Sequence, residues 1–225
     1  MKILALETAV DPGSVALWLD GRVVGRVCPP GVSNSEALLP EAAAVLRGEG
    51  LDFGDLDGIA FGMGPGSFTG LRVACGVAQG LAFALGRPLL GVGALEAMAL
   101  AAGATRVIAA LDARMGEIYH GRFVDGRLEG EIGVCAPEGI PLPDSSGWLA
   151  CGDGLARYPA LRERLAGAVS DWRPDIVPRA DALARLAGLR MERGEGADPA
   201  LAAPFYVRNK VAKTVAERLA EGGRA

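Results

Sequence analysis

A pattern that recurs at a spacing of 105 residues restricts the fold of this chain more than any other feature of its sequence. The Leu-Glu pair at 6–7 aligns with the Leu-Asp pair at 111–112, and the Asp-Gly-Arg triplet at 20–22 aligns with 125–127. A strand, its terminal carboxylate and a hairpin turn in one register indicate an internal duplication, with chance similarity of two hairpins as the alternative. We therefore predict two related domains within the 225 residues.

The order of the predicted elements gives the fold class. Strands are expected at 2–7, 14–20, 22–27, 56–61 and 88–92, and helices at 35–46, 69–85 and 94–102. Three meandering strands followed by alternating helices and strands are typical of a ribonuclease-H-like α/β unit. We predict two such domains, 1–103 and 104–225, each a mixed sheet with flanking helices.

The second domain is expected to be smaller and less regular than the first. It begins well formed at 105–124, whereas 137–146 reads as a loop rich in proline and serine. Helical patterns cover 159–193 in two pieces around a proline-rich break at 173–178. Residues 205–225 carry a local excess of basic side chains, which we interpret as a solvated helix or tail, with RNA or partner contact as the alternative.

The composition excludes several kinds of site. His120 is the only histidine, so no site with two histidine ligands can form, and its place in a predicted strand favours a surface residue. Cys28, Cys75, Cys135 and Cys151 form no CxxC pair, which favours reduced thiols. A net charge of -4 gives no general attraction to nucleic acid or an anionic membrane. No apolar run approaches the roughly 18 residues of a membrane span, so we expect a cytoplasmic protein with no membrane partner. Because there is one histidine and no CxxC pair, we also expect no metal site.

A glycine-rich segment at 64–70, Gly-Pro-Gly-Ser-Phe-Thr-Gly, lies between a predicted strand and a predicted helix. Backbone N–H groups of such a turn can bind an anion together with the helix N-terminus. The candidate phosphate-binding residues are Gly64, Gly66, Ser67 and Thr69. The segment lacks the Gly-Lys-Ser/Thr end of a Walker loop and the Gly-x-Ser-x-Gly frame of a nucleophile elbow. The alternative is a structural turn in which Ser67 or Thr69 caps the helix.

The helix predicted at 69–85 has two distinct faces. A bulky row suits packing on a sheet and consists of Val73, Val77, Leu81 and Leu85. A row of small residues suits the close approach of another helix and consists of Gly76, Gly80 and Ala84. Glycine inside a helix costs roughly 0.5–1 kcal/mol relative to alanine, so its presence needs a reason. The second helix is either 35–46 of the same chain or part of another subunit.

Two carboxylates, Glu7 and Asp112, end predicted strands beside the expected cleft between the domains. In a nucleotide hydrolase such groups would hold Mg²⁺ or a metal-bound water. The alternative is that each caps a turn.

Four segments, 2–9, 64–72, 111–119 and 204–212, resemble the bacterial TsaB (YeaZ) family over the length of the chain. The resemblance implies an actin-like, Hsp70-like two-domain fold and a role in the threonylcarbamoyl modification of the tRNA adenosine next to the anticodon. In that family the transfer belongs to a paralogue, TsaD, whose His-x-x-x-His metal motif a chain with one histidine cannot contain. The resemblance therefore implies a non-catalytic subunit without a cofactor of its own, although ATP or ADP binding stays open.

The partners implied by the resemblance are a TsaD-like paralogue that the chain binds and activates, a small TsaE-like ATPase, a second copy when the chain is alone, and tRNA indirectly. The implied contact residues on the two helices are Leu38, Leu39, Ala42, Val45, Val73, Gly76, Val77, Gly80 and Ala84. Asn34 departs from the histidine that family members often place there. An actin-like ATP-dependent kinase or phosphatase that uses Glu7 and Asp112 is the alternative function, and an endopeptidase is least supported because no nucleophile–base pair is present.

Overall fold

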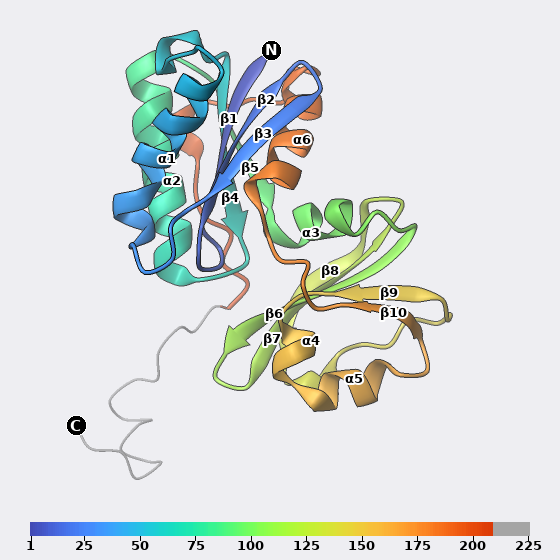
Figure 1. Cartoon of the computed structure of the whole chain (residues 1–225). Coiled ribbons are helices and arrows are strands. Elements are labelled where there is room, and N and C mark those ends of the chain that lie inside the picture. The colour runs from blue at the N-terminus through green and yellow to red at the C-terminus, as the bar shows by residue number, and fades with distance from the viewer. Residues whose placement is uncertain (209–225) are drawn as a thin grey trace, which may run out of the picture.

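The structure is a computed structural model that describes residues 1–208, arranged as two five-stranded mixed sheets with helices on their faces (Figure 1). The first sheet, in the order β3-β2-β1-β4-β5, contains β1 (Lys2–Glu7), β2 (Ser14–Leu19), β3 (Arg22–Val27), β4 (Gly58–Gly64) and β5 (Leu89–Gly93). The second, in the order β10-β9-β6-β7-β8, contains β6 (Arg106–Arg114), β7 (Glu117–Val124), β8 (Arg127–Cys135), β9 (Trp148–Cys151) and β10 (Val169–Arg173). The helices are α1 (Asn34–Gly48), α2 (Phe68–Leu85), α3 (Ala94–Ala102), α4 (Gly154–Arg157), α5 (Pro159–Leu165) and α6 (Ala180–Met191), with 3₁₀ turns at Phe53–Asp55, Pro137–Gly139 and Pro199–Leu201.

The two sheets repeat one topology. In each, three strands form an antiparallel meander, and two later strands add in parallel on the other side of the first strand. Both meanders contain a two-residue turn in which Asp20 or Asp125 has positive φ and is followed by glycine. Such turns match the twist of a hairpin. The predicted fold class of two mixed α/β sheets is therefore confirmed, and the shared strand order supports the duplication.

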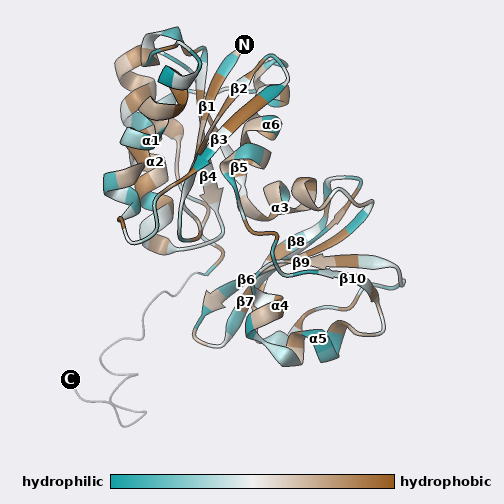
Figure 2. Cartoon of the chain, in the orientation of Figure 1, coloured by the Kyte–Doolittle hydropathy of each residue, from teal (hydrophilic) through white to brown (hydrophobic). Residues whose placement is uncertain are grey.

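Helices α1 and α2 cover one face of the first sheet. Leu4 and Leu6 of β1 point to that face and are fully buried with Leu38 of α1 and Ala78 of α2. Because alternate strand residues point to opposite faces, the neighbours of these leucines in β1 need a cover on the other side. Figure 2 shows apolar residues along the strands of this sheet and mixed apolar and polar residues on α1.

Helix α6 supplies that second cover. Its Leu183 and Ala187 are buried against Ile3, Ala5 and Trp18 of the first sheet. We expected the whole range 104–225 to form the second domain, and for α6 this is wrong. The reason is that the first sheet is apolar on both faces, so burying the β1 residues opposite α1 and α2 requires a helix that the first hundred residues do not provide.

The second sheet contains two short strands that the sequence pattern did not predict. β9 lies between β6 and β10. β10 forms at Val169–Arg173, so the helical pattern expected from 159 to the break at 173 is wrong after α5. Strands of four and five residues contain too few side chains for a clear periodic signal. Helix α3 packs between the sheets, since Leu95 and Met98 join the core of the second sheet while Ala97 joins that of the first.

Helix α2 corrects one further expectation. With 18 residues it is long and apolar enough, by length and composition alone, to cross a membrane, although no such run was predicted. In this fold its buried residues lie against the first sheet, and they include Ala74, Cys75, Ala78 and Ala82. The apolar character of the helix thus has a packing explanation on one face, and its other face is described below.

Candidate functional site

A cleft of about 630 Å³ separates the two sheets. The first domain lines it with the β1–β2 loop and the starts of α1 and α2, and the second with the end of β6 and the turn that follows. Asp112 is among the lining residues, whereas Glu7 is not. The sequence thus predicted a cleft at the correct strand ends, but the structure brings only one of the two candidate carboxylates to it.

Glu7 and Asp112 have the same local role in the two domains. Glu7 Oε1 accepts a hydrogen bond from the backbone N–H of Ala9 at 2.6 Å, and Asp112 Oδ1 accepts one from that of Arg114 at 2.8 Å. Each carboxylate therefore caps the backbone two residues ahead. This is the turn-capping alternative from the sequence, and the duplication explains why it appears twice.

Glu7 is buried, with 1% of its surface exposed, and its Oε2 atom has no hydrogen-bond partner within the described residues. Burial raises the pKa of Glu7 from 4.5 to about 7, against smaller opposing effects of the Ala9 and Thr8 amides and of Arg179. Its side chain lies directly over Gly62 of β4, where any larger residue would collide with it. The carboxyl group is thus enclosed within the first domain.

Asp112 is held by charged and polar neighbours from its own domain. Tyr158 donates its hydroxyl to Asp112 Oδ1 at 2.7 Å, and Arg157 Nε lies 3.1 Å from Oδ2. Arg114 adds a second guanidinium at 3.4 Å. The carboxylate is therefore already paired with two guanidinium groups and a hydroxyl. No group of three or more His, Cys, Asp or Glu side chains within residues 1–208 is placed to hold a metal ion.

The glycine-rich loop is built by close packing. Gly66 and Gly70 lie so near Ala9 and Thr8 that a Cβ atom at either glycine would collide with the β1–β2 loop. The N–H of Ser67 donates to the Ala9 carbonyl at 2.8 Å, and the Ser67 side chain accepts from Gly70 N to cap α2. These contacts correspond to the structural-turn alternative. Ser67 and Thr69 are exposed and border the cleft, whereas Gly64 is buried beside Leu71.

The small-residue row of α2 faces open space. A methyl group added to Gly76 or Gly80 would meet no atom within 4 Å, and Ala84 is exposed. Phe68 and Phe83, 40% and 60% exposed, lie toward the two ends of this row. The bulky row that we expected to face the sheet is only partly buried at the side of the helix, because alanines and Cys75 occupy the sheet-facing side. Packing of the glycine row against 35–46 of the same chain, one of the two alternatives, is therefore wrong.

The implied contact residues on α1 are mostly core residues. Leu38, Ala42 and Val45 are at most 3% exposed and lie in the core between α1 and the first sheet, so they cannot contact another protein in this conformation. The prediction is wrong for these three because helical periodicity does not say which face is buried. Leu39, 43% exposed, points outward. Asn34, at the start of α1, accepts a hydrogen bond from Gly13 N at 2.9 Å and so anchors the β1–β2 loop.

The four cysteines are free thiols, as predicted, whereas His120, predicted to be a surface residue, is only partly exposed. Cys28, Cys75 and Cys151 are buried free thiols, whereas Cys135 is half-buried. His120 is half-buried in β7, and desolvation, with a smaller effect of Arg122, lowers its pKa.

Residues 199–208 run along α2 and cross to the second domain, so the solvated helix or tail predicted for 205–225 is wrong for 205–208, which contact both domains. Gln79 of α2 donates to the carbonyls of Pro199 and Ala202 at 2.9 and 3.1 Å. Arg208 then contacts Glu117 and the Ala113 carbonyl of the β6–β7 hairpin. The motif at 204–212 was noticed only as part of the family resemblance. The remaining basic residues, 209–225, lie outside the described part of the chain.

Comparison with known proteins identifies the family. The chain is 37% identical to the tRNA threonylcarbamoyladenosine biosynthesis protein TsaB of Escherichia coli (strain K12), over 94% of this chain and 96% of that protein. The chain belongs to the TsaB family. A Haemophilus influenzae member of this family of tRNA threonylcarbamoyladenosine biosynthesis proteins is 33% identical over 94% of the chain and 95% of its own length. The family model TsaD, tRNA N6-adenosine threonylcarbamoyltransferase, matches residues 25–135.

Solved structures agree with this assignment. The crystallised YeaZ from Pseudomonas aeruginosa has a TM-score of 0.83 and 39% identity, over 91% of this chain and 99% of that one. The resemblance given by the four sequence segments is thereby confirmed, and this TsaB-family chain shares the fold of that YeaZ structure, with two mixed five-stranded sheets.

Proposed function

We propose that this TsaB-family chain is a non-catalytic, cytoplasmic subunit in tRNA threonylcarbamoyladenosine biosynthesis that binds and activates a TsaD-like paralogue. The observation that supports it most is the outward stripe of α2, defined by Phe68, Gly76, Gly80, Phe83 and Ala84. Glycines in the middle of an exposed helix face allow the axis of another helix to approach closely. Exposed large apolar residues beside them are typical of interaction surfaces.

The same stripe suits the other proposed contacts. A second copy can use it when the TsaD-like paralogue is absent, because two identical patches related by a two-fold axis are self-complementary. Partly buried Val73 and Val77 and exposed Leu39 extend the apolar surface toward α1. We place the TsaE-like ATPase on the assembled pair and tRNA on the partner subunit, so that this chain meets tRNA indirectly.

Three observations support a role without chemistry or a cofactor of its own, ATP and ADP included. Asp112 is paired with Arg157 and Arg114, and Glu7 does not line the cleft. The Ser67 amide, which a phosphate-binding turn would offer to its ligand, donates to Ala9 instead.

The test is the substitution Gly76→Leu or Gly80→Leu in a pull-down with the TsaD-like paralogue. Each leucine would project into open space in the free chain, so the chain should fold, but it would block the approach of a partner helix. We expect capture to fall at least tenfold. Gly167→Leu is the matched control, because Gly167 is exposed and has open space around it in the second domain.

If both α2 variants captured the TsaD-like paralogue as well as the parent chain does, the outward stripe of α2 would not be the interface. ATP turnover by the chain alone, lost on Glu7→Gln, would overturn the non-catalytic assignment in favour of the kinase or phosphatase alternative.

A further inference from the structure

The first sheet has one covered edge and one free edge. At the β5 edge, Leu89 forms a backbone bridge with Ala197 of the segment that follows α6. At the other edge, β3 pairs only with β2 within the described residues. Figure 1 shows β3 as the outermost strand of this sheet, with α1 and α6 on its two sides. An exposed edge strand presents unpaired N–H and C=O groups that can accept another strand.

The register of the hairpin identifies the free groups. Leu19 and Arg22 flank a two-residue turn and therefore form a hydrogen-bonded pair, after which bonded and non-bonded pairs alternate along the ladder. The N–H and C=O groups of Val23, Gly25 and Val27 consequently point away from β2. Within residues 1–208, none of these three takes part in a backbone hydrogen bond outside the strand ladder.

A groove of about 350 Å³ follows this edge between β3 and α6. Its β3 wall includes Gly25, which has no side chain to fill the space, and Val27, which is 51% exposed. Its opposite wall includes Arg179, which directly precedes α6, and Arg185 of α6. We name these lining residues, together with the outward groups of β3, the edge groove.

The charge of the edge groove favours an acidic occupant. Neither Arg179 nor Arg185 has a carboxylate within 4.0 Å among the described residues, and Arg179 is bonded only to the Pro12 carbonyl. The one acidic lining residue, Asp181, accepts a hydrogen bond from the neighbouring Ala182 N–H. On the opposite face of β3, Arg26 is already paired with Glu41 of α1.

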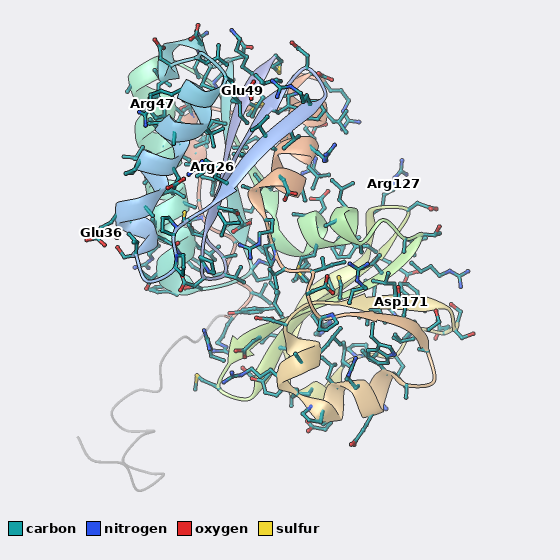
Figure 3. All side chains as sticks on the ribbon, viewed as in Figure 1. Arg26, Glu36, Arg47, Glu49, Arg127 and Asp171 are labelled. Atoms are coloured by element: carbon teal, nitrogen blue, oxygen red, sulfur yellow. The ribbon has the colours of Figure 1, made fainter. Side chains whose placement is uncertain are left out.

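The edges of the second sheet are different. Its β8 edge carries Glu129 and Glu131, and its β10 edge carries Asp171, labelled in Figure 3. Acidic side chains on an edge oppose the addition of an acidic strand. The β3 edge combines free backbone groups, an open groove and two arginines without carboxylate partners among the described residues.

We propose that the edge groove binds an extended acidic peptide segment of a partner protein, which adds to β3 as a sixth strand. Backbone bonds to Val23, Gly25 and Val27 would supply affinity, and alternate acidic side chains would face Arg179 and Arg185. This site lies on the α6 face of the sheet, opposite α2, so it is independent of the proposed paralogue interface.

The test uses a fluorescein-labelled peptide of alternating glutamate and valine, six residues long, in an anisotropy titration with the full chain. We expect saturable binding and protection of the Val23, Gly25 and Val27 amides from hydrogen exchange. Val27→Pro removes an outward N–H and should weaken binding at least tenfold, whereas Val27→Thr, which keeps it, should not. Arg185→Glu should also weaken binding tenfold or more. Arg127→Glu is its control, because Arg127 is exposed and lies on the second domain (Figure 3).

Three outcomes would overturn the proposal. The first is no saturable binding to the folded chain, and the second is equal binding by Val27→Pro and Val27→Thr. The third is self-association that Val27→Pro abolishes while the peptide stays unbound, since that result assigns the edge to a second copy of the chain.

Discussion

At the residue scale, the carboxyl group of Glu7 makes stability depend on pH. Because its pKa is raised from 4.5 to about 7, the folded chain keeps a proton that the unfolded chain releases. The resulting stability is fully present below pH 4.5 and is lost as the pH rises through 7, by about 3 kcal/mol in total. Glu7→Gln can still accept the Ala9 hydrogen bond but cannot ionise. The free energy of unfolding of this variant should therefore not show this decrease between pH 5 and pH 8, which urea denaturation at the two pH values can measure.

Glu163→Gln is the control for this comparison, since Glu163 is exposed on α5. Equal pH dependence in the parent chain and in Glu7→Gln would contradict the buried, protonated state. At this scale the sequence correctly placed two carboxylates at the ends of equivalent strands. It could not indicate that Asp112 is already paired, because Arg157 and Tyr158 come from more than forty residues later in the chain.

At the element scale, two glycines of α2 have opposite surroundings: Gly70 is tightly packed and Gly76 faces open space. Gly70 packs against the Thr8 carbonyl, so Gly70→Ala forces a collision with backbone and should destabilise the chain by about 1–3 kcal/mol. Gly76→Ala meets nothing and improves helix propensity, so it should stabilise the chain by roughly 0.8–1 kcal/mol. Denaturant midpoints of the two variants are the measurement. Destabilisation by Gly76→Ala in the isolated chain would show that this position already packs within the chain.

The sequence predicted α2 and its small-residue row, but not which row faces the sheet. Neither of the two predicted rows faces the sheet, because a third row of alanines and Cys75 packs there against Leu4 and Leu6 of β1. Because helical spacing likewise does not show which face of α1 is buried, Leu38, Ala42 and Val45 were wrongly predicted as partner contacts, although they are buried in the core. Local periodicity determines an element, whereas its orientation depends on residues far away in the sequence.

At the scale of the whole molecule, duplication explains the two sheets but not how the domains are joined. The repeat predicted the first strand and the hairpin turn of both halves and, as one of two alternatives, the capping carboxylates, but not β9 and β10. It did not predict that α6 returns to the first sheet, although α3, which follows β5 as α6 follows β10, likewise packs on the sheet of the other domain. It also did not predict that residues 199–208 follow α2, because this segment has no counterpart in the first half of the chain. Residues 199–208 connect α2, the proposed interface helix of this chain, to the second domain. Tyr206 contacts Phe68 and Arg72 of α2, and Arg208 reaches the β6–β7 hairpin.

This connection predicts that Arg208 restrains the domains. Its guanidinium bonds to the Ala113 carbonyl and to Glu117, and hydrogen bonds of a charged group contribute about 1.5–3 kcal/mol. Arg208→Ala should therefore speed hydrogen exchange at the Gly116 and Glu117 amides about tenfold or more, while exchange in β1 and α6 stays unchanged. Arg127→Ala is the control, since Arg127 has no ion pair among the described residues. Faster exchange across the whole chain would instead mean that Arg208 stabilises the fold globally, and unchanged exchange in the hairpin would show that Arg208 does not restrain the domains.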